Sequence, residues 1–220
     1  MKKIKTVLFD LDGTLADTAP DLAGALNHVL KSHNYDPLPY ETIRPHVSHG
    51  GAALTTLGFG KEHPEFDSLY KELLSHYEAN IANETNLFEG MNELLLELEK
   101  NNMNWGVVTN KPAWLTEPLM EALNLSSRAA AIVSGDTLEE RKPHPAPILY
   151  ACEQAGSEAA ECIYVGDAER DIEAGNRAGM LSVVALFGYI AESDTPNDWG
   201  AHASISHPKE IISIIQSLNE

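Results

Sequence analysis

The chain has 220 residues, of which 43% are hydrophobic, enough to bury the core of one domain with a modest insertion. Fifteen basic residues stand against thirty-three acidic ones, and the net charge of −18 argues against nucleic acids and anionic membranes as partners. The two cysteines, Cys152 and Cys162, are too few for a disulfide framework or a metal cluster, so we expect reduced, buried thiols.

The N-terminal segment begins with Met1-Lys2-Lys3 and continues into a short apolar run that reaches Asp10. This run is too short for a signal peptide and predicts a strand over Thr6–Leu11. No apolar stretch approaches the ~18 residues that a membrane-spanning helix needs. The sequence therefore predicts a soluble, cytoplasmic protein.

Two carboxylates follow directly, in Asp10-Leu11-Asp12-Gly13-Thr14. Residues i and i+2 of a strand point the same way, so Asp10 and Asp12 are expected to face one site, one as a nucleophile and the other as a proton donor. Gly13 lets the turn present N–H groups to an anion, which makes Gly13 and Thr14 candidate substrate-binding residues.

Between residues 17 and 88 two helical periods follow each other with no strand between them. The apolar face of the first helical period consists of Leu22, Leu26, Val29 and Leu30. The apolar face of the second consists of Phe66, Leu69, Tyr70, Leu73, Tyr77 and Ile81. Thr18, followed by Pro20 and Asp21, indicates a helix start. We expect an all-helical cap domain at 17–88, inserted into a core domain made of 1–16 and 89–220.

A polar, glycine-bearing segment, Pro45–Gly51, is expected to form a loop within this cap. Paired glycines before a helix can present N–H groups to an anion, so His49, Gly50 and Gly51 are candidate substrate contacts. His46 is a weaker candidate. Arg44 either pairs with a substrate carboxylate or lies on a solvated helix face.

The remaining sequence alternates short β-rich runs with helical periods, which is typical of a parallel sheet covered by helices. Strands are predicted at Asn104–Thr109, Ala131–Val133, Cys162–Val165, Leu181–Leu186 and Ala203–Ile205. Helices are predicted at Met91–Lys100, Trp114–Leu123, Pro145–Ala155, Glu169–Ala178 and Pro208–Leu218. Open sheets of this kind bind ligands at the carboxyl ends of their strands.

Four segments in order resemble the signatures of the haloacid dehalogenase-like (HAD) superfamily. The segment Leu8–Thr14 resembles the first, and Val107–Asn110 the second. Lys142, within Arg141–Pro145, resembles the third, and Gly166–Asp171 the acidic fourth. The resemblance implies a Rossmann-like α/β core with a helical cap.

The resemblance also implies a metal site and a nucleophile. Asp10 would take the phosphoryl group, and Mg²⁺ would be held by the carboxylates of Asp10 and Asp167 and the backbone carbonyl of Asp12. Asp171 would orient a metal-bound water or Lys142, or complement the helix dipole.

The other signature residues would hold the phosphate. Thr109 and Asn110 would donate hydrogen bonds to it, and Lys142 would add a positive charge. Lys111 is close in sequence and is equally compatible with a solvent-facing position.

Asp12 also favours one reaction class, because a dehalogenase needs no acid two residues after its nucleophile. A phosphatase is favoured over a phosphomutase, since the cap shows no clear second anion site. A phosphatase is also favoured over a non-catalytic binding protein, since the residues that catalysis would need are all present: Asp10, Asp12, Lys142 and Asp167.

Over most of its length the chain resembles bacterial phosphoglycolate phosphatases, and some segments resemble the branch that hydrolyses N-acetylmuramic acid 6-phosphate in cell-wall recycling. Both substrates are small carboxylate-bearing phosphate esters, and both stay open. The sequence says nothing of oligomeric state.

Overall fold

The structure is a computed structural model that describes residues 2–219. Its centre is a six-stranded parallel sheet with the strand order β5-β4-β1-β6-β7-β8. The strands are β1 (Thr6–Phe9), β4 (Asn104–Val108), β5 (Ala131–Val133), β6 (Cys162–Gly166), β7 (Leu181–Ala185) and β8 (Ala203–Ile205). The predicted α/β fold class and all six predicted strands are thus confirmed.

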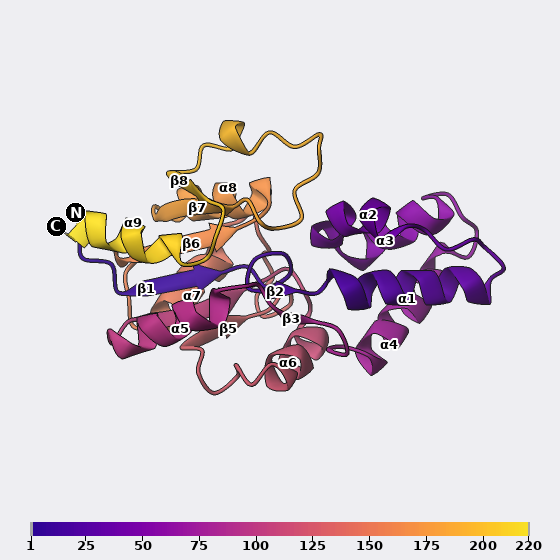
Figure 1. Cartoon of the computed structure of the whole chain (residues 1–220), viewed down its shortest axis with the longest axis horizontal. Helices are drawn as coiled ribbons and strands as arrows, with labels where there is room; N and C mark the ends of the chain where they lie inside the picture. Colours follow the sequence, from indigo (N-terminus) through magenta and orange to yellow (C-terminus); the bar gives the residue numbers. More distant parts are fainter. Residues whose placement is uncertain (1, 220) are drawn as a thin grey trace.

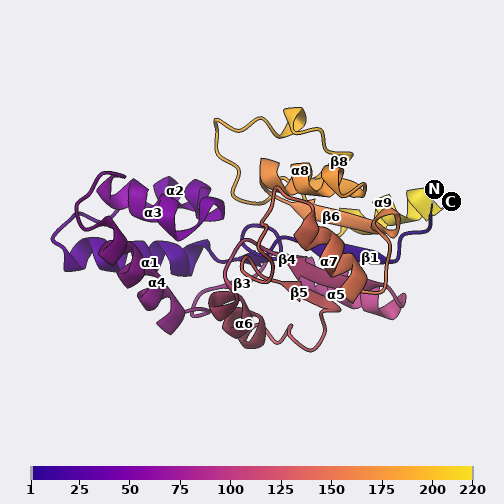
Figure 2. The ribbon, with the colours of Figure 1, turned by 180° about the vertical axis from the view of Figure 1, so that it is seen from behind.

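Helices cover both faces of this sheet (Figures 1 and 2). They are α5 (Met91–Lys100), α6 (Ala113–Ala122), α7 (Ala146–Gln154), α8 (Glu169–Arg177) and α9 (Glu210–Asn219), with short 3₁₀ turns η2 (Ala159–Glu161) and η3 (Pro196–Asp198). The expected helices agree with these to within two residues at each end.

Successive side chains of a strand point to opposite faces of the sheet, which shows what each residue of β1 packs against. Val7 and Phe9 of β1 point into a cluster with α5, α6 and α9, whereas Leu8 packs with residues of α7 and α8. Trp105 is the largest side chain buried in the first of these clusters. Burial on both faces explains why the central strands read as continuous apolar runs.

The segment from α1 to α4 lies beside the sheet, at the right of Figure 1. It comprises α1 (Ala19–Ser32), α2 (Tyr40–Ile43), the 3₁₀ helix η1 (Arg44–His49), α3 (Gly50–Phe59) and α4 (Phe66–Ala79). The chain enters and leaves it through a two-stranded antiparallel ribbon of β2 (Ala16–Asp17) and β3 (Asn86–Leu87). The domain division at 17–88 stays a prediction.

Two local expectations were wrong. The first strand ends at Phe9, so Asp10 and Asp12 lie in the loop beyond it. The expected loop 45–51 is helical: η1 runs to His49, and Gly50 begins α3. The helix start expected at Thr18 is confirmed, because α1 begins at Ala19, although the Thr18 hydroxyl makes no capping bond and donates to Asp12.

The cysteines are reduced and buried as expected, with their Sγ atoms 3.5 Å apart. Within residues 2–219, no helix combines the length and apolar character needed to cross a membrane.

Candidate active site

A cavity of about 550 Å³ lies between the helical segment and the loops after β1 and β4. Its lining includes seven predicted site residues: Asp10, Asp12, Thr109, Asn110, His49, Gly50 and Gly51. It also includes Lys111, Arg141 and Arg170. Three basic side chains therefore line this cavity in a protein whose net charge is −18.

Asp10 is buried and held by Lys142. The Lys142 ammonium lies 2.9 Å from Asp10 Oδ1 and 2.7 Å from Asp171 Oδ1, and it donates to the Tyr164 hydroxyl at 2.8 Å. Asp171 accepts the Ala168 N–H with its other oxygen at the start of α8. Asp171 thus both orients Lys142 and caps the helix, so the two expectations for this residue are compatible.

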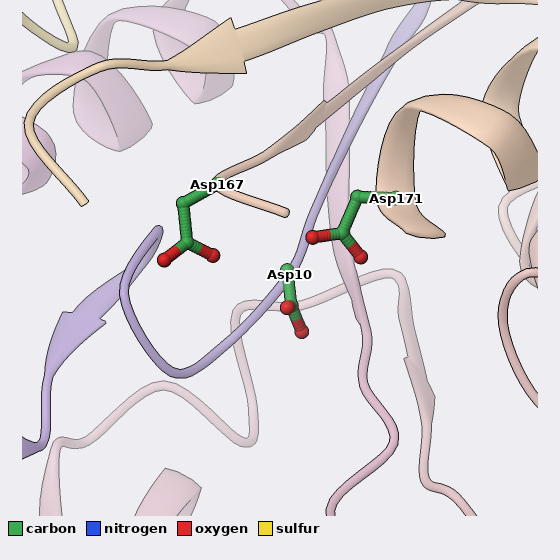
Figure 3. A group of neighbouring side chains, drawn as sticks. All are labelled: Asp10, Asp167 and Asp171. Atoms are coloured by element: carbon green, nitrogen blue, oxygen red, sulfur yellow. The ribbon is translucent and has the colours of Figure 1, made fainter. Parts of the chain in front are cut away.

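Figure 3 shows three carboxylates gathered at this point, from the end of β1, the end of β6 and the first turn of α8. One oxygen of each of Asp10, Asp167 and Asp171 lies within 4.8 Å of the others. Burial, with repulsion from Asp10 and Asp171, raises the pKa of Asp167 to about 7. Burial, followed by repulsion from Asp171, also raises the pKa of Asp10.

The donor set fits a magnesium ion. Mg²⁺ prefers hard oxygen ligands and a few carboxylates. Lys142 neutralises Asp10 and Asp171, but the contacts of Asp167 with described residues are neutral: the hydroxyls of Thr14 and Ser48 and the N–H of Tyr189. Asp167 is therefore the carboxylate that a bound cation would stabilise most.

Asp12 faces the cavity from the same loop. Its Oδ1 accepts the Thr18 hydroxyl at 2.7 Å and the Lys111 ammonium at 2.8 Å. Oδ2 has no hydrogen-bond partner within residues 2–219. One oxygen is thus fixed while the other remains available to a ligand.

Asn110 positions a neighbouring loop. Its side-chain amide donates to the Lys142 carbonyl at 2.9 Å and accepts the Lys142 N–H at 3.1 Å. Thr109 is buried at the end of β4, and its hydroxyl accepts the Lys111 N–H. Asn110 therefore joins the second and third signature segments.

Gly13 and Thr14 lie behind Asp167 instead of on the cavity wall. The Gly13 N–H donates to the Ala16 carbonyl, and the Thr14 hydroxyl points to Asp167 Oδ1 at 3.3 Å. Gly13 has a φ of +86°, and a Cβ there would overlap the Asp167 carboxylate. In this structure Gly13 and Thr14 contact Asp167 and do not line the cavity, where a substrate contact was expected.

The helical segment reaches the site through η1 and α3. Ser48 donates to Asp167 Oδ2 at 2.7 Å, and its carbonyl accepts a bond from Arg170 at 2.6 Å. His49 and the two glycines lie on the cavity wall. No sequence signal singles out Ser48, because both of its partners are more than a hundred residues away.

Arg44 has neither of the two expected positions. It donates to the carbonyls of Phe187 and Gly188 and lies 4.9 Å from the centre of the Tyr189 ring. Arg44 therefore attaches the helical segment to the loop after β7. His46 is not part of the cavity lining.

Arg170 is a basic cavity residue that sequence reasoning missed, and Lys111, whose position the sequence left open, faces the cavity and not the solvent. Lys111 is almost fully buried, with 7% of its side chain exposed. Both lie next to signature residues, so proximity to a signature was the available signal. It could not show which way either side chain points.

Comparisons with known proteins agree with this geometry. The family model described as haloacid dehalogenase-like hydrolase matches residues 7–185. An N-acetylmuramic acid 6-phosphate phosphatase of Pseudomonas putida is 39% identical over 218 residues, covering 98% of this chain and 97% of that protein. A phosphoglycolate phosphatase of Xanthomonas campestris is 40% identical over 212 residues, covering 96% of each chain.

Among solved structures, a predicted phosphoglycolate phosphatase from Haemophilus somnus is similar with a TM-score of 0.86 and 27% identity, covering 97% of this chain and 99% of that one. The family match covers most of the chain, and these relatives match almost end to end. The chain therefore belongs to the haloacid dehalogenase-like hydrolase family, whose relatives matched here are named phosphatases.

Proposed function

We propose that this protein is a Mg²⁺-dependent phosphatase that hydrolyses the phosphate ester of a small carboxylate-bearing metabolite, similar to phosphoglycolate, through an aspartyl-phosphate intermediate. The observation that carries the proposal is the placement of Asp10 and Asp12 on one cavity, with Lys142 bound to the first and Lys111 to the second. The names of the relatives support the same reaction class.

The first step forms the intermediate. A carboxylate oxygen of Asp10 attacks phosphorus as the bond to the ester oxygen breaks. Asp12, protonated on the unpartnered Oδ2, donates that proton to the departing oxygen. Lys142, already 2.9 Å from Asp10, offsets negative charge at the attacking group.

The second step releases phosphate. Asp12 is now a carboxylate and removes a proton from a water molecule, whose oxygen attacks the phosphorus. The bond between phosphorus and Asp10 breaks, which restores both side chains to their starting states. A magnesium ion, held by Asp10 and Asp167 with the Asp12 carbonyl, would stabilise negative charge on the phosphate oxygens.

The oxygens of the phosphate need further donors. The Thr109 hydroxyl lies on the cavity wall beside Asp10 and is free to donate while it accepts the Lys111 N–H. The Asn110 side chain is occupied by the Lys142 backbone, so we assign its contribution to the placement of Lys142.

A second candidate substrate is N-acetylmuramic acid 6-phosphate. A cavity of about 550 Å³ falls in the range of pockets that hold drug-sized ligands and is larger than a two-carbon acid requires. Tyr70 and Trp114 on its wall provide aromatic surface for a sugar. The cavity volume is the observation that favours this substrate.

Phosphate release tests the proposal. Purified enzyme with Mg²⁺ is given 2-phosphoglycolate, N-acetylmuramic acid 6-phosphate or an aryl phosphate, each with and without EDTA. We expect EDTA-sensitive release, with one natural substrate strongly preferred. Release from none of the three would reject the phosphatase assignment and favour a mutase or a non-catalytic protein.

A further inference from the structure

Lys111 is a buried cation that the reaction steps above do not use. Its ammonium donates to Asp12 Oδ1 at 2.8 Å and to the Tyr77 hydroxyl at 2.9 Å, and it lies 4.5 Å from the centre of the Tyr77 ring. Tyr77 belongs to α4 of the helical segment and is fully buried. Lys111 is thus held in one place by partners from both sides of the cavity.

This amine keeps its charge. Burial alone lowers the pKa of Lys111, but attraction to Asp12 outweighs it, and the pKa lies above the ordinary value. An ammonium has three N–H donors. Within residues 2–219 its side-chain acceptors are Asp12 and Tyr77, so one donor is left for a ligand in the cavity.

The other basic residues near the cavity are placed differently. All three donors of Lys142 are occupied, by Asp10, Asp171 and the Tyr164 hydroxyl. Arg170 donates to the Ser48 carbonyl and keeps further N–H groups, but the carboxylates whose charges act on it are Asp171, Asp10 and Asp167, not Asp12. Arg141 is exposed. Lys111 therefore combines burial, charge, a fixed position and an available donor.

We propose that Lys111 is a specificity-determining residue that binds a substrate carboxylate placed a few bonds from the ester oxygen. The inference rests on the proposed function. Asp12 addresses the ester oxygen with one carboxylate oxygen, and Lys111 is bound to the other. A carboxylate joined to the ester oxygen through a single carbon, as in 2-phosphoglycolate, therefore comes within reach of the ammonium. A charge-assisted bond formed out of bulk water is strong enough to select substrates.

The test compares two substrates of the same shape, 2-phosphoglycolate and its uncharged amide, 2-phosphoglycolamide. We expect the wild-type enzyme to prefer the acid in kcat/KM. Lys111→Met keeps the apolar stem and removes the ammonium, and the preference should fall about 10- to 100-fold. Any general loss caused by disturbing Asp12 affects both substrates and cancels in the ratio. Lys111→Gln, which can still donate to Asp12, provides a second variant if the first folds poorly.

Arg141→Gln is the matched control, because it removes a positive charge from the exposed part of the same cavity wall. It should leave the preference unchanged. Binding gives a second readout: in an Asp10→Asn background, calorimetry should show 2-phosphoglycolate binding weakened by Lys111→Met, with 2-phosphoglycolamide little affected.

The outcomes separate this inference from the proposed function. An equal loss on both substrates in the Lys111 variants would overturn it, as would a preference that depends on Arg141 instead. A wild-type enzyme that hydrolyses acid and amide equally well would also overturn it while leaving the phosphatase intact. No hydrolysis of any phosphate ester would reject the proposed function itself.

Discussion

Replacing Lys142 by Met should destabilise the protein strongly in the absence of metal. The Lys142 side chain has no solvent exposure and forms ion pairs with Asp10 and Asp171, whose own side chains are 4% and 0% exposed. Removing one partner of a buried ion pair costs about 3–5 kcal/mol, because the other charge stays buried. We expect a loss of about that size in the free energy of unfolding at pH 8 in EDTA.

The pH dependence of this loss has a definite sign. The pKa of Asp10 is already raised in the folded protein by burial and by repulsion from Asp171, and removing the Lys142 ammonium, which lowers it, raises it further. A carboxyl with a raised folded-state pKa contributes stability that disappears as pH rises through that pKa. The deficit of Lys142→Met should therefore grow as pH rises.

Urea unfolding followed by circular dichroism, with EDTA or excess Mg²⁺, measures these quantities. Magnesium should restore part of the lost stability, by about 2.7 kcal/mol at a hundred times its Kd. Lys2→Met, at an exposed lysine, is the control and should leave unfolding unchanged. A deficit below about 1 kcal/mol at pH 8 in EDTA, or one that shrinks as pH rises, would refute the reasoning.

Three further results are expected. Asp10→Asn should abolish phosphate release while the circular dichroism spectrum stays native; substantial residual turnover would show that another group is the nucleophile. Wild-type protein in EDTA should lose stability as pH rises from about 4 to about 7, because folded Asp167, with a pKa of about 7, retains a proton that the unfolded chain has released. Mg²⁺ binds the deprotonated carboxylate, so it should raise Tm more at pH 8 than at pH 6. Asp167→Asn should weaken this pH dependence. His49→Ala should change the ratio of kcat/KM between 2-phosphoglycolate and N-acetylmuramic acid 6-phosphate more than it changes turnover of an aryl phosphate, because His49 lies on the cavity wall. A uniform loss on all three substrates would exclude a role of His49 in substrate recognition.

The sheet and its helices could be predicted because local pattern and burial agree there. The apolar run Ile163–Val165 is buried on both faces, and a parallel strand in that position needs such a run. Segment 45–51 was misjudged because its Pro and Gly residues are typical of turns. Pro45 is tolerated in the first turn of η1, and α3 begins at Gly50.

The parts of the site that the sequence could not predict depend on contacts between residues that are distant in the sequence. Lys111 is 99 residues from Asp12 and 34 from Tyr77, so nothing in its neighbourhood indicates burial. Ser48 is 119 residues from Asp167. Sequence signatures identified the residues that do chemistry, whereas the residues that orient them depend on the assembled fold.

The β2–β3 ribbon has a consequence for engineering. Ala16 pairs with Leu87 and Asp17 with Asn86, so the chain enters the helical segment and leaves it at adjacent, paired positions. A segment attached in this way can be replaced by another of different length without changing the distance between its attachment points. Grafting the helical segment of a relative with another substrate onto Ala16 and Leu87 would thus transfer one wall of the cavity and leave Asp10, Lys142 and Asp167 in place.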